Sequence, residues 1–180
     1  NKIKKAINNG ITVSFGNQEK LEKFIEIYEE TMKRDNAEDY YFFKKEYYDC
    51  MLENLKENTI IFSADLNNQT LSTCIVFYCN GKASYHLSGS TRTTTNLYET
   101  NLLLYEVGKW ANKNGLKSFL LGGGVGSKED NLYQFKKGFD DKHSYQFYIG
   151  KKIYNQNIYD ELVSKRNNIE NINYFPKYRG

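Results

Sequence analysis

The sequence predicts an α/β (α+β) domain with a mixed, mostly antiparallel sheet and a central parallel βαβ crossover. Three apolar runs, 59–66, 70–79 and 83–90, are separated only by short stretches rich in Asn and Gly, which is typical of an antiparallel meander. A long amphipathic segment at 98–114 then leads to a short apolar run at 117–121. A helix between two neighbouring strands indicates a right-handed parallel crossover, with 117–121 as a buried strand.

The other elements follow from hydrophobic periodicity and from helix-ending residues. Residues 1–8 combine three lysines with Ile3 and Ile7, which indicates the end of a basic amphipathic helix that stops at Asn9-Gly10. Residues 11–15 alternate between apolar and polar and predict a strand. The same patterns predict helices at 19–33, 41–55, 129–137 and 158–169, and strands at 144–149 and 152–154.

Composition restricts the class of protein. A chain of 180 residues fits one domain with a real core, and a net charge of +3 without a long basic tail argues against a non-specific nucleic-acid coat. Three cysteines, an odd number, argue against a disulfide framework. The sequence has no apolar stretch long enough to span a membrane, no signal peptide and no cluster of metal-ligand residues. We therefore expect a cytoplasmic protein without a metal site.

The predicted crossover also indicates where a ligand would bind. Ligands of a parallel βαβ unit bind beyond the carboxyl ends of its strands. Here those ends are the Ser88-Gly89-Ser90 and Gly122-Gly123-Gly124 turns, and the helix at 129–137 would supply cations. The three glycines let backbone approach a ligand closely, although a purely structural turn is the commoner use of such a cluster.

The order of elements resembles the GNAT (Gcn5-related N-acyltransferase) fold, in which the strands on either side of the long helix splay apart to form the acyl-donor cleft. GNAT enzymes that use acetyl-CoA carry a Q/R-x-x-G-x-G/A loop before the long helix, whose backbone N–H groups hold the pyrophosphate. The corresponding stretch here, 89–95, has one glycine, one arginine and several hydroxyl groups. It could hold an anion, but it departs from the usual coenzyme A loop.

Five motifs together resemble the second GNAT-like domain of the Fem-type (FemABX) aminoacyltransferases. They are the basic helix and strand at 1–11, the F-x-x-x-Y-x-x-T-x-x-R helix at 24–34, the long helix at 101–115, the Leu-Gly-Gly-Gly and Phe-Lys-Lys-Gly-Phe pair within 121–139, and the run 149–155. The resemblance implies a bacterial, methicillin-resistance-factor-like enzyme of peptidoglycan biosynthesis. Such an enzyme transfers an aminoacyl group from aminoacyl-tRNA to an amine of a peptidoglycan precursor, and so builds cell-wall cross-bridges.

The resemblance also implies partners, domains and a location. The partners would be aminoacyl-tRNA as the donor, a lipid-linked or nucleotide-linked muropeptide, and a second GNAT-like domain upstream; no cofactor is needed. We expect a linker helix at 1–10 from that upstream domain, a GNAT-like domain at 11–170 and a loose tail at 171–180. The location would be the cytoplasm, with peripheral association at the inner membrane face.

Two other functions stay open from the sequence. The first is a stand-alone N-acyltransferase that uses acyl-CoA. The second is a non-catalytic half of a tandem-domain protein, which binds only tRNA or its partner domain. An exposed apolar face around Ile3, Ile7 and Phe15 would favour this second alternative.

Three residues are candidate catalytic groups: Lys136, Phe135 and His86. The Lys136 cation, held beside the Phe135 ring, could offset phosphate or oxyanion charge; alternatively, Phe135 and Phe139 form core packing and leave Lys136 in solvent. His86 could accept a proton near neutral pH or serve a structural role. The candidate substrate-binding residues are Tyr85, Ser88, Arg92, Asn101, Gly122, Gly123, Gly124 and Lys137.

Overall fold

The computed structural model describes residues 1–93, 95–166, 168, 171 and 173–180, and it divides into two compact units. The first unit is Asn1–Phe139 and the second is Asp140–Gly180. The helix predicted at 158–169 ends earlier in the structure, at Ser164. The predicted domain end at residue 170 lies outside the described residues, as does Thr94 in the hydroxyl-rich loop.

A five-stranded sheet organises the first unit, and its strands follow one another in chain order. The first four strands pair antiparallel, and the last two pair parallel through the helix α4 (Glu99–Lys113). This arrangement confirms the predicted mixed, mostly antiparallel fold with a βαβ crossover. The five strands are β1 (Thr12–Gly16), β2 (Thr59–Leu66), β3 (Gln69–Cys79), β4 (Lys82–Ser90) and β5 (Ser118–Leu120).

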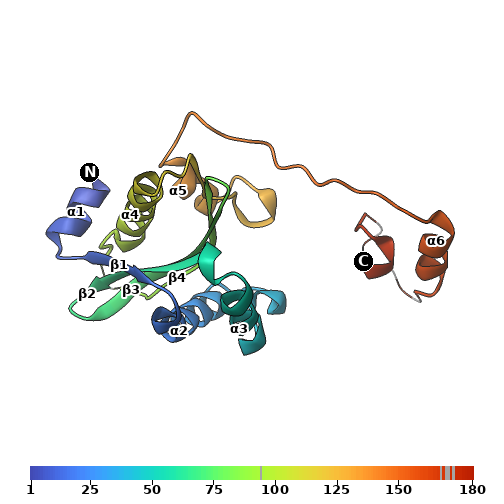
Figure 1. Cartoon of the computed structure of the whole chain (residues 1–180), viewed down its shortest axis with the longest axis horizontal. Helices are drawn as coiled ribbons and strands as arrows, with labels where there is room; N and C mark the ends of the chain where they lie inside the picture. Colours follow the sequence, from blue (N-terminus) through green and yellow to red (C-terminus); the bar gives the residue numbers. More distant parts are fainter. Residues whose placement is uncertain (94, 167, 169–170, 172) are drawn as a thin grey trace. The chain divides into compact units, whose positions relative to one another are not determined.

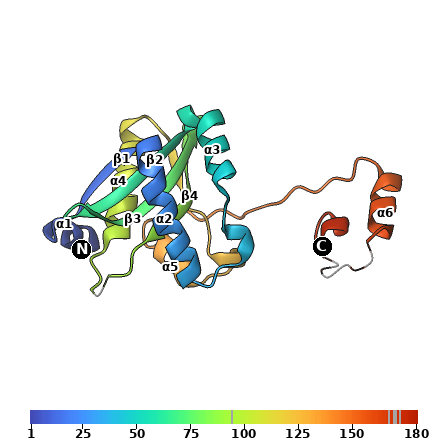
Figure 2. The ribbon, with the colours of Figure 1, turned by 90° about the horizontal axis from the view of Figure 1, so that it is seen from below.

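Two pairs of helices cover opposite faces of the sheet (Figures 1 and 2). The helices α1 (Lys2–Asn8) and α4 pack on one face, whereas α2 (Gln18–Arg34) and α3 (Lys45–Asn54) pack on the other. Each face therefore has its own apolar core. The first core is centred on Phe62, Cys74, Val76, Leu103 and Val107, and the second on Phe24, Tyr28, Tyr48, Ile61 and Ile75.

Helix α2 lies unusually close to the end of β4. A Cβ atom added to Gly89 would lie 2.7 Å from the carbonyl oxygen of Ile27 and 2.8 Å from the Cα of Tyr28. The Thr31 hydroxyl accepts a hydrogen bond of 2.9 Å from the Ser90 N–H and donates to the Ile27 carbonyl. The Ser88-Gly89-Ser90 stretch, predicted as a turn, is therefore strand that α2 holds in place.

The structure corrects the predicted helix at 41–55. Residues Asp39–Tyr41 form a 3-10 helix, η1, and α3 begins only at Lys45. The Tyr28 hydroxyl donates a 3.0 Å hydrogen bond to the Tyr41 carbonyl, and the Phe43 ring stacks on Tyr47 at 4.3 Å. These tertiary contacts favour an extended segment between the two helices over the helix that periodicity predicts.

The strands predicted after the crossover also differ in the structure. The strand predicted at 117–121 is present as β5, which has three residues. Its predicted burial is wrong, because β5 lies at the edge of the sheet and Leu120 is 58% exposed. Residues 144–154, all of them described, contain no strand. An alternating apolar pattern makes a strand only where a neighbouring strand accepts its hydrogen bonds, and no such ladder forms here among the described residues.

Two short helices complete the described chain. Helix α5 (Asn131–Lys137) ends the first unit and begins at the predicted cap Asp130, whose carboxylate accepts a 2.8 Å hydrogen bond from the Tyr133 N–H. Helix α6 (Gln156–Ser164) belongs to the second unit. There, the Tyr159 ring stacks on Phe175 with ring centroids 6.2 Å apart, and its hydroxyl accepts from the Lys177 N–H.

Candidate functional site

The ladder between β4 and β5 stops after three residue pairs, the last of which joins Ser84 to Leu120. Strand β4 continues for six further residues along β3, so from Tyr85 onward its other edge has no β5 partner. The chain beyond β5 turns away through Gly122, whose φ of +73° lies in the left-handed region that favours glycine. The two parallel strands thus separate at the predicted position, with the glycine loop opposite the open edge of β4.

Lys136 connects the glycine loop with β4. Its Nζ donates a hydrogen bond of 2.8 Å to the Gly123 carbonyl and lies 5.6 Å from the centre of the Tyr85 ring. The side chain is half-buried, and this burial lowers the pKa of Lys136, while the nearby Asp130 carboxylate acts in the opposite direction. A partly desolvated ammonium group interacts more strongly with an anion than one in bulk water does.

Asp130 holds the glycine loop and α5 as one piece. One oxygen of its carboxylate accepts from the Val125 N–H at 2.9 Å, while the other accepts from the Tyr133 N–H. These backbone hydrogen bonds lower the pKa of the Asp130 carboxyl, that of Tyr133 having the largest effect. The carboxylate also occupies the space that a Cβ on Gly124 would need. The position of Lys136 relative to the loop is therefore fixed by hydrogen bonds and by the lack of a side chain at Gly124.

Tyr85 and Ser88 lie on the same face of β4 as Lys136. Burial raises the pKa of the Tyr85 phenol, with a further contribution from Cys74, and a hydrogen bond with Ser88 opposes the shift. The structure therefore brings together five of the residues predicted from the sequence: Lys136, Tyr85, Ser88, Gly122 and Gly123.

His86 lies on the opposite face of β4 from Tyr85, as alternation along a strand requires, and β4 contains a bulge at this residue. Ile75 of β3 pairs with Leu87 and Val76 pairs with Tyr85, which leaves His86 as an extra residue. The His86 ring stacks on Phe77 with centroids 4.4 Å apart, and its Nε2 lies 2.6 Å from the Tyr47 hydroxyl. Desolvation lowers the pKa of His86. Tyr85 and His86, adjacent in β4, thus face opposite sides of the sheet.

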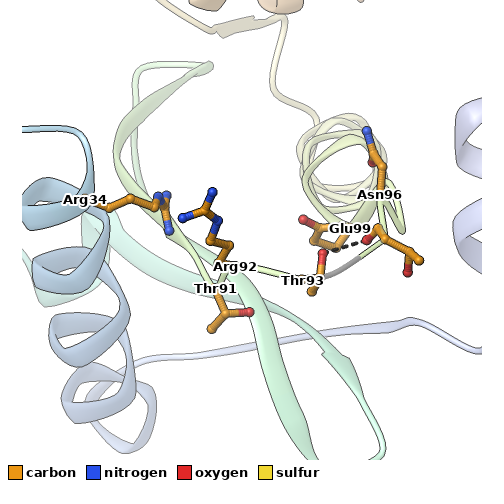
Figure 3. Close-up of a pocket in the computed structure, with 7 residues that line it drawn as sticks. Arg34, Thr91, Arg92, Thr93, Asn96 and Glu99 are labelled. Carbon is orange, nitrogen blue, oxygen red and sulfur yellow. Dashed lines mark hydrogen bonds between the residues drawn. The ribbon is translucent and has the colours of Figure 1, made fainter.

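Arg92 lines a pocket of about 580 Å³ beyond the end of β4. The Arg34 and Arg92 guanidinium groups, from α2 and from the loop before α4, point toward one another there (Figure 3). Arg34 is anchored by a 2.7 Å hydrogen bond from its Nη1 to the Ser90 carbonyl. Thr91, Thr93, Thr95, Asn96 and Glu99 also line this pocket.

The other predicted residues lie outside the group around Lys136 and outside the pocket lined by Arg34 and Arg92. Phe135 packs edge-on against Phe139 with ring centroids 5.6 Å apart, and both rings are only partly buried. Lys137 is exposed, and its Nζ lies 5.6 Å from the centre of the Tyr133 ring. Asn101 is half-buried on α4, and its side chain makes no hydrogen bond to the described residues. No group of three metal-ligand side chains occurs within the described ranges.

Sequence reasoning missed Tyr47. It is 39 residues from His86 in the chain, and no local pattern connects the two. The only signal was the density of aromatic residues between positions 40 and 48. The position of Arg34 beside Arg92 depends on how closely α2 packs against β4.

Comparison with protein families and solved structures finds one family model and several acyltransferase-like structures that are similar to this chain. The model of the FemAB family matches residues 1–75. The fold matches a crystal structure of FemX with a TM-score of 0.63 and 15% identity, over 76% of this chain and 51% of FemX. The chain thus spans about half the length of FemX. No curated protein sequence matches the chain.

Two acetyltransferase structures share the same fold. One is an aminoglycoside acetyltransferase, meta-AAC0020, from an uncultured soil metagenomic sample in complex with sisomicin; its TM-score is 0.59 at 13% identity, over 81% of this chain and 99% of the other. The second is a predicted acetyltransferase from Clostridium acetobutylicum with acetyl-CoA; its TM-score is 0.54 at 14% identity, over 77% and 96% of the two chains. Both likenesses confirm the predicted GNAT-like fold.

No helix in the described part of the chain has the length and apolarity needed to cross a membrane. The FemAB model matches residues 1–75, less than half of the chain, and the fold is similar to that of FemX. Both findings agree with the resemblance seen in the sequence.

Proposed function

We propose that this chain is the half of a Fem-type acyltransferase that transfers an aminoacyl group from aminoacyl-tRNA to an amine of a peptidoglycan precursor. The observation that carries the proposal is the position of Lys136, a half-buried cation held between the Gly123 carbonyl and the Tyr85 ring, where β4 and β5 separate. The FemAB family match supports this class of reaction. The proposed setting is the cytoplasm, where aminoacyl-tRNA is available.

The chemistry of aminoacyl transfer fits a fixed cation. The acceptor amine attacks the ester carbonyl, an N–C bond forms, and negative charge develops on the carbonyl oxygen. The ester C–O bond then breaks, and a proton passes from the attacking nitrogen to the leaving ribose oxygen. The Lys136 ammonium group would stabilise the charge that develops, because it is positioned in advance and only partly solvated.

The pocket beside Arg34 and Arg92 supports a donor that carries phosphate. Two guanidinium groups facing one another and several threonine hydroxyl groups can bind phosphate oxygens through charge-assisted hydrogen bonds. Both an RNA backbone and the pyrophosphate of coenzyme A offer this chemistry. The stand-alone acyl-CoA enzyme therefore remains the second candidate, and the likeness of the fold to acetyltransferases favours it.

Two separate titrations of the purified chain distinguish these donors. One uses coenzyme A and the other an aminoacylated minihelix RNA, with binding followed by calorimetry or chemical shift. The proposal expects minihelix binding that is weaker in Lys136→Ala and unchanged in Lys137→Ala, whose exposed side chain makes a matched control. Micromolar binding of coenzyme A would establish the acyl-CoA enzyme instead. If neither ligand binds, the chain needs the rest of the protein for donor binding, as the second alternative supposes.

A further inference from the structure

Two adjacent residues of β4, Tyr85 and His86, place candidate functional side chains on opposite faces of the sheet. Tyr85 faces the side of Lys136, and His86 faces the side of α2 and α3. Neither residue has a β5 partner, since the parallel ladder stops at Ser84. The open edge of β4 therefore borders both faces of the sheet.

The bulge sets the orientation of His86 relative to Leu87. In a regular strand His86 and Leu87 would point to opposite faces. The extra residue in β4 instead turns both of them to the face covered by α2 and α3, where Leu87 packs in the second core. Bulges are found next to active sites because they redirect a side chain without ending the strand.

Aromatic rings hold both His86 and its partner Tyr47 in place. Tyr47 is half-buried and stacks on Phe43 at 4.3 Å, while Tyr48 meets the Tyr47 ring edge-on at 5.3 Å. Phe77 holds the imidazole from the other side. The 2.6 Å contact between the Tyr47 hydroxyl and the His86 Nε2 therefore joins two side chains that are both held in place.

The exposure of His86 leaves the ring available for chemistry. The residue is exposed, and the hydrogen bonds among the described residues involve only its Nε2, so Nδ1 has no partner among them. Desolvation lowers the pKa of the His86 imidazole and raises that of the Tyr47 phenol. The titratable groups that act on Tyr47 or are acted on by it are the Tyr28 and Tyr48 phenols.

We infer that His86 accepts a proton from the ammonium form of the acceptor substrate at Nδ1, and that Tyr47 is the positioning residue that holds its Nε2–H. This role, which rests on the proposed acyl transfer, makes the α2 and α3 face of β4 the side from which a primary amine enters. The ammonium group loses one proton to His86, which returns it to water. The free amine then attacks the donor ester as described above, so that charge and protons balance.

The Tyr47 oxygen stabilises the imidazolium form, because it accepts the Nε2–H hydrogen bond that the protonated ring donates. Tyr47→Phe is therefore expected to lower the pKa of His86 further. Ring ¹⁵N and ¹H NMR of the whole chain, recorded across pH, measures this shift without any substrate. Tyr40→Phe, a change at an exposed tyrosine of the same aromatic segment, is expected to leave the His86 titration unchanged.

Activity gives the second readout. With aminoacylated minihelix and a lysine-containing peptide, His86→Gln is expected to lower kcat/KM by about 10²–10⁴-fold and to remove the acid limb of its pH profile. Tyr47→Phe is expected to move that limb in the direction of the NMR shift. An unchanged or raised His86 pKa in Tyr47→Phe overturns the inference, whether or not the wild-type chain transfers aminoacyl groups. Absence of transfer from the aminoacylated minihelix would count against the proposed function. The NMR result would still decide the role of Tyr47.

Discussion

The Nζ of Lys136 donates a 2.8 Å hydrogen bond to the carbonyl oxygen of Gly123, thirteen residues away in the chain. This contact joins the last turn of α5 to the loop that leaves the parallel strand, so the cation lies where the two parallel strands separate. A surface lysine in the last turn of a helix usually extends into solvent, as Lys137 does here. The position of the Lys136 side chain thus depends on its hydrogen bond to the glycine loop as well as on its place in α5.

Replacing Lys136 by Met is expected to affect activity far more than stability. Loss of a cation positioned for the oxyanion should reduce transfer about 10²–10³-fold. The free energy of unfolding should change by less than about 1 kcal/mol, because removing a partly desolvated charge offsets the lost hydrogen bond. Denaturant unfolding and single-turnover transfer measure the two effects. A large loss of stability, or equal losses of activity in Lys136→Met and Lys137→Met, would contradict the assignment.

Gly89→Ala should destabilise the first unit by about 1–3 kcal/mol, because the new methyl group would meet the backbone of α2 at 2.7–2.9 Å. Gly108→Ala is the matched control within α4. Nothing lies within 4 Å of its new methyl group, so the change should stabilise the helix by about 0.5–1 kcal/mol. Midpoints of urea unfolding give both values. Equal midpoints for the two variants would rule out the close packing of α2 on β4.

Thr31→Val is expected to cost about 1–3 kcal/mol, since it keeps the shape of the side chain but leaves the Ser90 N–H without its acceptor. Thr31 is 7% exposed, so water cannot fully replace the lost hydroxyl. Thr31→Ser keeps the oxygen and should recover most of the loss in thermal unfolding. If Thr31→Ser were as unstable as Thr31→Val, methyl packing rather than the hydrogen bond would be responsible.

Substitutions at two positions of the glycine loop distinguish the effect of backbone strain from the effect of contact with a ligand. Gly122→Ala should lower stability by about 1 kcal/mol, because its φ of +73° is unfavourable for a residue with a side chain. Gly123 does not have a positive φ, and nothing lies within 4 Å of a Cβ added there. Gly123→Ala should therefore fold normally and reduce donor binding only if a ligand approaches the loop. Normal donor binding by Gly123→Ala would place the ligand elsewhere.

Asp130→Ala should destabilise the fold, and the size of this loss should depend on pH. The folded pKa of Asp130 is below its usual value of 3.8, so the ionised carboxylate stabilises the fold above that pH. This contribution is lost as the pH falls through the folded pKa. The difference in unfolding midpoint between wild type and Asp130→Ala should therefore shrink between neutral pH and acid. A difference that stays constant down to the acid limit would show that Asp130 acts only through packing.

The sequence predicts the sheet well because its signals are local. The Asn67-Asn68 and Asn80-Gly81 pairs both have positive φ, as two-residue hairpin turns require, and they fix the order of the antiparallel strands. Helices α2 and α4 carry apolar stripes that end within a residue or two of their predicted limits. These elements depend on neighbouring residues, which the sequence displays directly.

The site is only partly predictable, because its geometry depends on tertiary packing. In the sequence, the glycine run at 122–124 and the lysine at 136 indicate a ligand-facing loop. The structure brings Lys136, Gly122 and Gly123 together beside Tyr85. No local pattern predicts the bulge at His86 or its contact with Tyr47, because both depend on register and on α3. The strands expected at 144–149 and 152–154 fail for the same reason, since a strand needs a neighbour.

The run Tyr145-Gln146-Phe147-Tyr148-Ile149 has a consequence for handling the isolated chain. Its four apolar side chains are 69–83% exposed, and the run has high β propensity, no charge and no proline. Such segments promote intermolecular cross-β association. Lys142 on one side and Lys151-Lys152 on the other are charges of the kind that delay it by repulsion. Solutions of this chain should therefore become turbid as added salt screens those lysines, and recover clarity when Phe147 is replaced by Lys.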